Sequence, residues 1–139
     1  MGGIIVGRFI SFRGKRVDNG EWIEGDLIHN IIGHKCFIRS CELSPIIAVE
    51  DRTVCQNVTV CGEEHESVYE GDIVSFPSFN EQYNFGFIAW EYYGWVLKIK
   101  CGKKQMPLSL IDYEDWEQAK VVGNIYDNPE LLNAKFDNL

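Results

Sequence analysis

Two carboxylates near the middle of the chain are placed to do chemistry. Glu70 and Asp72 flank Gly71 and follow Tyr69, just before an apolar run. Paired carboxylates in a turn bind a cation or act as general acid and base. The alternative is structural, since glycine supplies an unusual φ and aspartate accepts hydrogen bonds from the backbone of a turn. No nucleophile or partner base lies nearby, and Gly-Asp recurs at residues 25–26. We therefore favour a turn or bulge device used twice.

Histidines and cysteines gather between residues 29 and 41. His29, His34, Cys36 and Cys41 lie within thirteen residues, and on a strand residues 34 and 36 would share one face. A metal could use that face, but the spacing matches no common zinc pattern. We therefore expect loop histidines beside a buried thiol, with no metal and no cofactor.

The chain has five cysteines, an odd number, and no pair has C-x-x-C spacing. We expect free, reduced thiols that behave as small hydrophobic residues. The sequence also contains no P-loop, no G-x-G-x-x-G run and no Ser-His-Asp or Cys-His arrangement. We therefore expect a protein that is not an enzyme and has no catalytic residues.

One basic cluster lies beside aromatic residues of a predicted hairpin. It consists of Lys98, Lys100, Lys103 and Lys104. Lysines interleaved with aromatic rings bind single-stranded nucleic acid by stacking and charge, so the hairpin over residues 85–104 is a candidate nucleic-acid surface. The alternative is a solvated strand whose lysines protect a sheet edge. Thirteen basic and 21 acidic residues give a net charge of −8, which disfavours binding to phosphates.

Three tyrosines are candidates for contact with a protein partner. Tyr83, Tyr92 and Tyr93 flank a predicted hairpin tip, where they cannot all enter the core. Exposed aromatic rings offer a large contact area at small entropic cost. Acidic runs at residues 63–70 and 112–117 would steer basic partners toward the protein. Mimicry of nucleic-acid charge is a second possibility of the same kind.

Length and composition indicate one soluble globular domain. The chain has 139 residues, with 45% hydrophobic and 24% charged side chains. That is long enough to bury a core without disulfides or metals. No apolar run approaches the ~20 residues needed to span a bilayer. We therefore expect no membrane contact and a location in the cytoplasm.

Glycine and turn pairs recur at short intervals, which is typical of a meandering β protein. Asp18-Asn19-Gly20 predicts a turn, since Asn-Gly tolerates positive φ. In the run 95–100, Trp95, Leu97 and Ile99 alternate with Val96 and two lysines, so we expect the apolar set on one sheet face. We expect these three residues to be buried together with Ile73, Phe87 or Ile88, and Ile125. The predicted strands are residues 4–12, 21–28, 35–39, 46–49, 53–60, 73–76, 85–91, 95–100 and 121–126.

Helix signals are confined to the last third of the chain. Residues 110–118 can hold one or two helical turns, with Asp112 as the N-cap. Asn128 and Pro129 suit the N-cap and first position of a short final helix. We expect the tail 133–139 to fray.

Three blocks of the sequence stand out together. They are residues 22–28 (WIEGDLI), residues 68–74 (VYEGDIV) followed by 86–90 (GFIAW), and residues 121–132 (VVGNIYDNPELL). In this order and at this spacing they resemble the YopX family of phage and prophage proteins. The resemblance covers nearly the whole chain, and the third block is its most specific part. It implies a phage or prophage origin and a mostly β fold. It supplies no activity, and no catalytic or binding residue is carried over from it.

These observations predict a mainly β fold with one or two short helices and an N-terminal β-hairpin, in a single domain over residues 1–139. We expect residues 71–100 to form a small SH3-like or partly open barrel. We expect a non-catalytic accessory protein of a phage or prophage in the host cytoplasm, acting through contacts with an unidentified protein. Binding of single-stranded nucleic acid is the alternative. We also expect self-association into a closed homo-oligomer, because short strands leave edges that must be covered.

Overall fold

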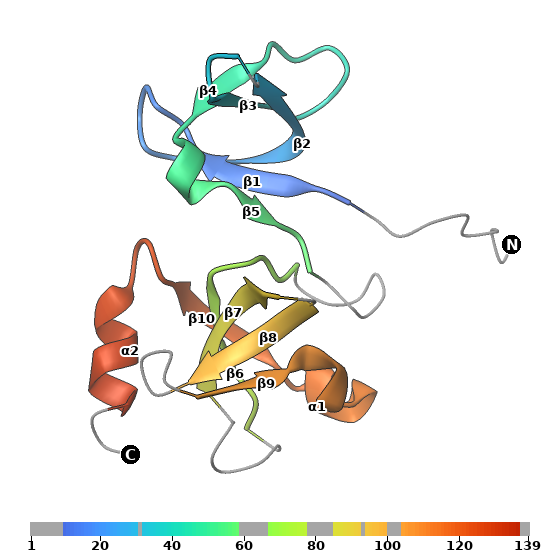
Figure 1. The fold of residues 1–139 in the computed structure, drawn as a ribbon, viewed down its shortest axis with the longest axis vertical. Helices are drawn as coiled ribbons and strands as arrows, with labels where there is room; N and C mark the ends of the chain where they lie inside the picture. Colours follow the sequence, from blue (N-terminus) through green and yellow to red (C-terminus); the bar gives the residue numbers. More distant parts are fainter. Residues whose placement is uncertain are drawn as a thin grey trace, which may run out of the picture. The chain divides into compact units, whose positions relative to one another are not determined.

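The computed structural model describes residues 10–30, 32–58, 67–77, 85–92, 94–99 and 104–136. It confirms a mainly β fold with short helices, built as two five-stranded antiparallel sheets (Figure 1). The sheets do not close into a full barrel, which agrees with the partly open alternative. The chain divides into two compact units, Met1–Asn57 and Val58–Leu139, and each contains one sheet.

The first unit is a sheet with the strand order β4-β3-β2-β1-β5. An isolated bridge from Arg16 to Val49 links the end of β1 to β4. The expected N-terminal hairpin is present as β1 and β2. The elements are β1 (Phe12–Lys15), β2 (Trp22–Asn30), β3 (Lys35–Arg39), β4 (Ile47–Val49), the 3₁₀ helix η1 (Asp51–Thr53) and β5 (Cys55–Gln56).

The long strand β2 serves two partners in succession. Its first part, up to Gly25, pairs with β1, and its second part, from Asp26, pairs with β3. A Cβ atom at Gly25 would run into the backbone carbonyl of Arg39, so only glycine allows the two chains to approach so closely here. Asp26 is exposed. Gly25 therefore lies at the point where β2 changes from pairing with β1 to pairing with β3.

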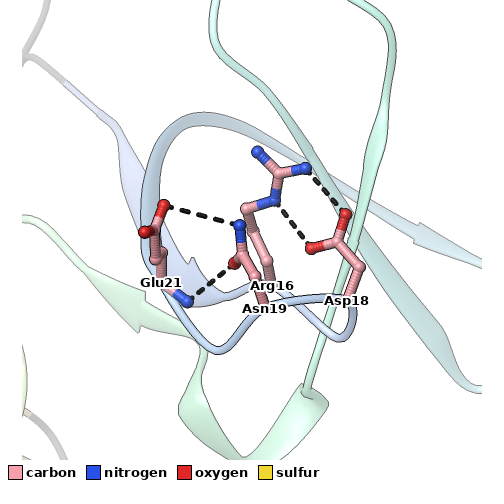
Figure 2. Close-up of polar contacts among 4 residues, drawn as sticks. All are labelled: Arg16, Asp18, Asn19 and Glu21. Atoms are coloured by element: carbon pink, nitrogen blue, oxygen red, sulfur yellow. Dashed lines mark hydrogen bonds and ion pairs between the residues drawn. The ribbon is translucent and has the colours of Figure 1, made fainter.

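The turn between β1 and β2 is fixed by side chains that reach the backbone and one another. Arg16 donates to both carboxylate oxygens of Asp18, over 2.9 and 2.7 Å, and this hydrogen bonding lowers the pKa of Asp18 (Figure 2). Asn19 accepts a hydrogen bond from the backbone N–H of Glu21 at 2.9 Å. Gly20 has a φ of +74°. The predicted Asp-Asn-Gly turn is confirmed.

Two strand predictions in the first unit were wrong in extent. The strand expected over 4–12 begins at Phe12 among the described residues, since residues 10 and 11 are not in a strand and 4–9 lie outside the described part. The strand expected over 53–60 starts at Cys55, because Thr53 ends η1. The hydroxyl of Thr53 accepts a hydrogen bond from the N–H of Lys15 at 2.9 Å and donates one to the carbonyl of Glu50 at 2.6 Å. The β-branched Thr53, which we expected in a strand, therefore stabilises a helical turn through its side chain.

The second unit is an open sheet with the strand order β10-β6-β7-β8-β9. The region 71–100, expected to form the barrel core, contributes β6, β7 and β8 to it. The strand β9 was not predicted. The strands are β6 (Asp72–Ser75), β7 (Phe85–Glu91), β8 (Gly94–Ile99), β9 (Lys104–Pro107) and β10 (Lys120–Asn124).

The predicted alternation in β8 is confirmed for the described residues. Leu97 and Ile99 are fully buried, and the half-buried Trp95 packs against the same cluster. Lys98 lies on the opposite sheet face, where its partner across the ladder is Phe87. The buried cluster consists of Val58, Val68, Val74, Phe76, Ile88, Leu97, Ile99, Met106, Leu108, Ile111 and Trp116.

The strand β6 is buried on both faces. Ile73 and Val74 point to opposite sides of the sheet, yet both have no exposed surface. Val74 belongs to the main cluster. Ile73, which we expected in the same cluster as Trp95, therefore lies on the other face, and Ile125 is only half-buried. The strand β6 lies inside the sheet and is covered on both sides, and this explains why Ile73 is buried away from the cluster that contains Trp95.

Among the described residues, three helical segments follow the hairpin along the chain. They are η3 (Leu108–Leu110), α1 (Tyr113–Glu117) and α2 (Pro129–Phe136). Asp112 caps α1 as predicted, because its Oδ1 accepts from the N–H of Asp115 at 2.9 Å. The helix α2 starts at Pro129 as predicted and extends into the tail 133–139. Fraying of that tail and folding of both units as a single domain stay predictions.

Two glycines of the β7–β8 hairpin allow a matched test of this packing. A Cβ atom at Gly86 would clash with the carbonyl of Lys98 and with side chains of Leu97 and Ile99, whereas a Cβ at Gly94 meets nothing within 4 Å. We expect Gly86→Ala to lower the free energy of unfolding by about 1–3 kcal/mol through overpacking. Gly94→Ala should change it by less than about 1 kcal/mol. Urea unfolding followed by tryptophan fluorescence measures both, and equal losses would contradict the hairpin register.

Candidate functional site

The tip of the β7–β8 hairpin holds an aromatic side chain out in solvent. Tyr92 is 84% exposed and has a φ of +50°, the left-handed region that tight hairpin turns normally give to Asn or Gly. That conformation costs a non-glycine residue roughly 1–2 kcal/mol. A bulky ring kept at a position that favours Asn or Gly is a reason to look for function there. Tyr83 and Tyr93, the other two candidates for partner contact, lie outside the described residues.

An apolar groove of about 650 Å³ lies beside this tip. Pro107 and Leu108 come to it from the end of β9 and the start of η3, and Trp116 comes from α1. Such a volume is in the usual range of ligand-binding clefts. Its lining consists of Val58, Glu91, Tyr92, Gly94, Trp95, Val96, Gln105, Pro107, Leu108, Ser109, Ile111 and Trp116.

Aromatic rings extend from the groove to the outside of the hairpin. Trp90 is 54% exposed and packs edge-on against Trp95, with ring centroids 5.0 Å apart. Trp116 packs edge-on against Phe76 at the same distance and is buried. We call Trp90, Tyr92 and the groove the aromatic surface of the second unit. It combines buried anchoring rings with exposed ones.

Sequence reasoning found Tyr92 and missed most of this groove. Leu108, Ile111 and Trp116 follow the end of the hairpin at Ile99 by 9 to 17 residues, and the unpredicted strand β9 lies between them and the hairpin in the chain. A signal was nevertheless present. The apolar Ile111 and Trp116 border and interrupt the acidic stretch 112–117, so both must face either a core or a groove.

The described lysines of the basic cluster do not converge. Lys98 forms a half-buried ion pair with Glu91 across the hairpin. Lys98 lies opposite Phe87 and Lys104 lies opposite Ile99, so the two lysines belong to opposite faces of the sheet. The other two candidates, Lys100 and Lys103, lie outside the described residues. Of the described pair, only Lys104 is exposed.

The net charge of the protein is confined to its second unit. Residues 1–57 contain seven basic and seven acidic side chains, whereas residues 58–139 contain six basic and 14 acidic ones. The first unit is therefore neutral and the second carries the whole −8. The aromatic surface lies on the acidic unit, and this favours a basic partner over a phosphate backbone.

Four carboxylates lie on or beside the short helix α1, which also contributes Trp116 to the groove. They belong to Asp112, Glu114, Asp115 and Glu117. Desolvation raises the pKa of Asp115, and its hydrogen bond with Asp112 and the charges of Asp112 and Glu114 raise it further. Among the residues that the structure describes, no cation forms an ion pair with any of the four.

The segment Tyr69–Asp72 forms a turn. Its two carboxylates, Glu70 and Asp72, were candidates for cation binding or acid–base chemistry. Asp72 is 1% exposed, and its Oδ2 accepts from the N–H of Tyr69 at 2.8 Å. Gly71 has a φ of +86°. The structural alternative is thus the one the geometry supports. The comparison with residues 25–26 was wrong, because Gly25 lies within a strand and Asp26 is exposed, so two different devices share one dipeptide.

The segment after β10 is a closed network of amide and carboxylate groups. The Oδ1 of Asn124 accepts from the N–H groups of Tyr126 and Asp127, at 3.0 and 2.9 Å, and its Nδ2 donates to Asp127. Asn128 accepts from the N–H of Asn124 at 3.2 Å. A Cβ at Gly123 would clash with Asn128. These residues fix the exit from β10 into α2 and are not arranged as a binding site.

The sequence profile of the YopX protein family matches residues 11–133, which is most of the chain. The chain belongs to the YopX family. The match includes all three blocks that carried the resemblance, and the turn at Gly71 and the network at Asn124 are the structures that two of those blocks form. No curated protein shows significant similarity to the chain.

The described histidines and cysteines of this YopX-family chain are not gathered around a common point. His29 lies opposite Cys36 in the β2–β3 ladder, while His34 has a φ of +51° in the turn between these strands. Within the described part of the chain, no group of three potential ligands could hold a metal ion. Nor does that part contain a helix long and apolar enough to cross a membrane.

The thiols of Cys36 and Cys41 should differ in reactivity. A hydrogen bond to the Ser44 hydroxyl lowers the pKa of the exposed Cys41, whereas burial raises the pKa of Cys36. Because the thiolate is the nucleophile, we expect iodoacetamide to alkylate Cys41 first in the native protein. Peptide mass spectrometry over a time course measures the order. Ser44→Ala should slow Cys41 without affecting Cys36, and faster labelling of Cys36 would contradict the packing of β3.

The network at Asn124 should be important for stability. Asn124→Ala leaves two partly buried N–H groups without their acceptor, so we expect a loss of about 1–3 kcal/mol in the free energy of unfolding. Asp127→Asn serves as the control, since it keeps an oxygen for the Nδ2 of Asn124 and should cost less. Urea unfolding measures both. A neutral Asn124→Ala would show that the segment is held in place by other contacts.

Proposed function

We propose that this YopX-family chain is a phage or prophage accessory protein that catalyses no reaction and acts by binding another protein. The contact is made through the aromatic surface of the second unit. One observation carries the proposal: an exposed Tyr92 is kept in an unfavourable backbone conformation beside an apolar, aromatic-lined groove. Family membership supports the phage-type origin.

The composition of the aromatic surface supports protein binding. Protein interfaces are enriched in Trp and Tyr at their centres, where a few such residues provide most of the binding energy. Trp90 and Tyr92 are available at the surface, and Trp95 and Trp116 anchor the groove from the core. Large exposed apolar residues occur singly on most proteins, but here they adjoin one hollow.

Binding of single-stranded nucleic acid is the weaker candidate. It needs lysines next to stacking rings, whereas Lys98 is paired with Glu91 and lies on the sheet face opposite Trp95. The same unit carries a charge of −8, which repels a polyanion. The host cytoplasm and a closed homo-oligomer remain our expectations for location and assembly.

The role of Tyr92 can be tested without unfolding the protein. Asparagine accepts a positive φ better than tyrosine, so Tyr92→Asn removes the ring while relaxing the turn. We expect this variant to be at least as stable as the parent protein. It should capture about tenfold less of the partner protein, or less still. Capture from a lysate of a bacterium that carries a YopX-family prophage, quantified by mass spectrometry, measures retention.

Leu43→Asn is the matched control for this experiment. Leu43 is 97% exposed and belongs to the first unit, so its substitution removes an equally accessible apolar side chain. It should leave capture unchanged. Equal retention by the parent and Tyr92→Asn proteins would refute the proposed surface. Salt-sensitive binding of single-stranded DNA, lost on converting Lys98, Lys100, Lys103 and Lys104 to Glu, would put the nucleic-acid alternative first.

A further inference from the structure

We infer that the aromatic groove takes an extended basic peptide, a segment in which arginine or lysine alternates with proline or aliphatic residues. This inference rests on the proposed function and specifies its partner. The juxtaposition that carries it is an apolar groove whose lining includes Trp116 and Ile111, next to a helix with three carboxylates and a fourth at its N-cap, Asp112.

The charge around the groove selects a cationic occupant. Asp112, Glu114, Asp115 and Glu117 lie on or beside the helix that contributes Trp116, and no described cation pairs with them. Glu91 lines the groove itself but is already paired with Lys98. An arriving arginine or lysine therefore meets carboxylates at α1 that have no described counter-charge.

The rings of the groove favour the same chemistry. Arginine and lysine bind over the faces of Trp and Tyr, and arginine also stacks on them. Tyr92 at the hairpin tip is open to such contacts, and Trp95 lines the groove beside it. Proline and aliphatic side chains suit the apolar part contributed by Leu108 and Ile111.

The end of β9 makes strand addition a poor way to bind here. The strand β9 is an edge of the sheet, and it ends at Pro107, which has no N–H to donate to an incoming strand. The partner is therefore recognised through its side chains, in the groove. An extended peptide that carries alternating basic and apolar side chains can place one set over α1 and the other in the hollow.

A defined peptide tests this inference directly. The probe is a fluorescein-labelled heptapeptide of sequence RLPRLPR, and fluorescence anisotropy measures its binding to the whole chain at low salt. We expect binding to fall at least about fivefold when the arginines are replaced by glutamate, because attraction becomes repulsion. Replacing both leucines by serine should weaken binding by a similar factor, since about two buried side chains are lost.

Protein variants then locate the peptide. Glu114→Gln with Glu117→Gln removes two charges and leaves the Asp112 cap intact, so binding should weaken by about two- to fivefold without loss of stability. Ser109→Trp, at an exposed position of the groove lining, should block the hollow and weaken binding more strongly. Glu24→Gln with Glu42→Gln removes the same charge from exposed positions of the first unit and should have no effect.

The outcomes separate this inference from the proposed function. If RLPRLPR binds no better than its glutamate version, or if the two Gln pairs weaken it equally, the basic-peptide inference is refuted. Protein capture that depends on Tyr92 would still support the proposed function in that case. Failure of both experiments would refute both. Tighter binding of a fluorescein-labelled single-stranded oligonucleotide than of the peptide would also overturn the inference.

Discussion

One residue, Gly71, connects three strands of the second unit. Its N–H donates to the carbonyl of Ile88 in β7 at 2.8 Å, and its carbonyl accepts from the N–H of Ile125, just after β10, at 2.9 Å. It does so with a φ of +86°, which side chains other than glycine rarely adopt. The buried Asp72 holds the same turn by accepting from the N–H of Tyr69. The strand β6, which lies between β10 and β7, thus begins at a residue that is hydrogen-bonded to both neighbouring segments.

This connection explains why two blocks of the family sequence occur together. The block around Gly71 and the block around Asn124 are 53 residues apart in the chain, and the Gly71–Ile125 hydrogen bond joins them. Asn124 then satisfies the backbone N–H groups that follow β10. The side chains of Asp72, Asn124 and Asn128 in these blocks thus hold the sheet and its exits together. A search for function is therefore better directed to residues that such bonds leave available, and Tyr92 and Trp90 at the hairpin tip are the clearest of these.

Local sequence signals predicted the parts of the fold that local physics decides. The turn at Asn19-Gly20, the Asp112 cap and the alternation of Trp95, Leu97 and Ile99 each depend on residues a few positions apart. Other features depend on distant partners. The strand β9 forms because it pairs with β8 through backbone hydrogen bonds. Thr53 ends a 3₁₀ turn because Lys15 and Glu50 supply the hydrogen-bond partners of its hydroxyl. For the same reason, the hairpin tip was predicted from sequence whereas the groove lining from η3 and α1 was not.

The distribution of charge gives the two units different physical characters. A neutral first unit can approach partners of either sign, whereas a second unit with six basic and 14 acidic side chains presents a negative field to any partner. Within that field, the ion pair of Lys98 with Glu91 removes one described cation of the hairpin from long-range attraction, and the carboxylates of α1 remain without a described counter-charge. Electrostatics therefore favours a basic partner for the aromatic surface that we propose as a binding site. The apolar groove would add the contact area that charge alone, screened within about 8 Å at physiological salt, does not provide.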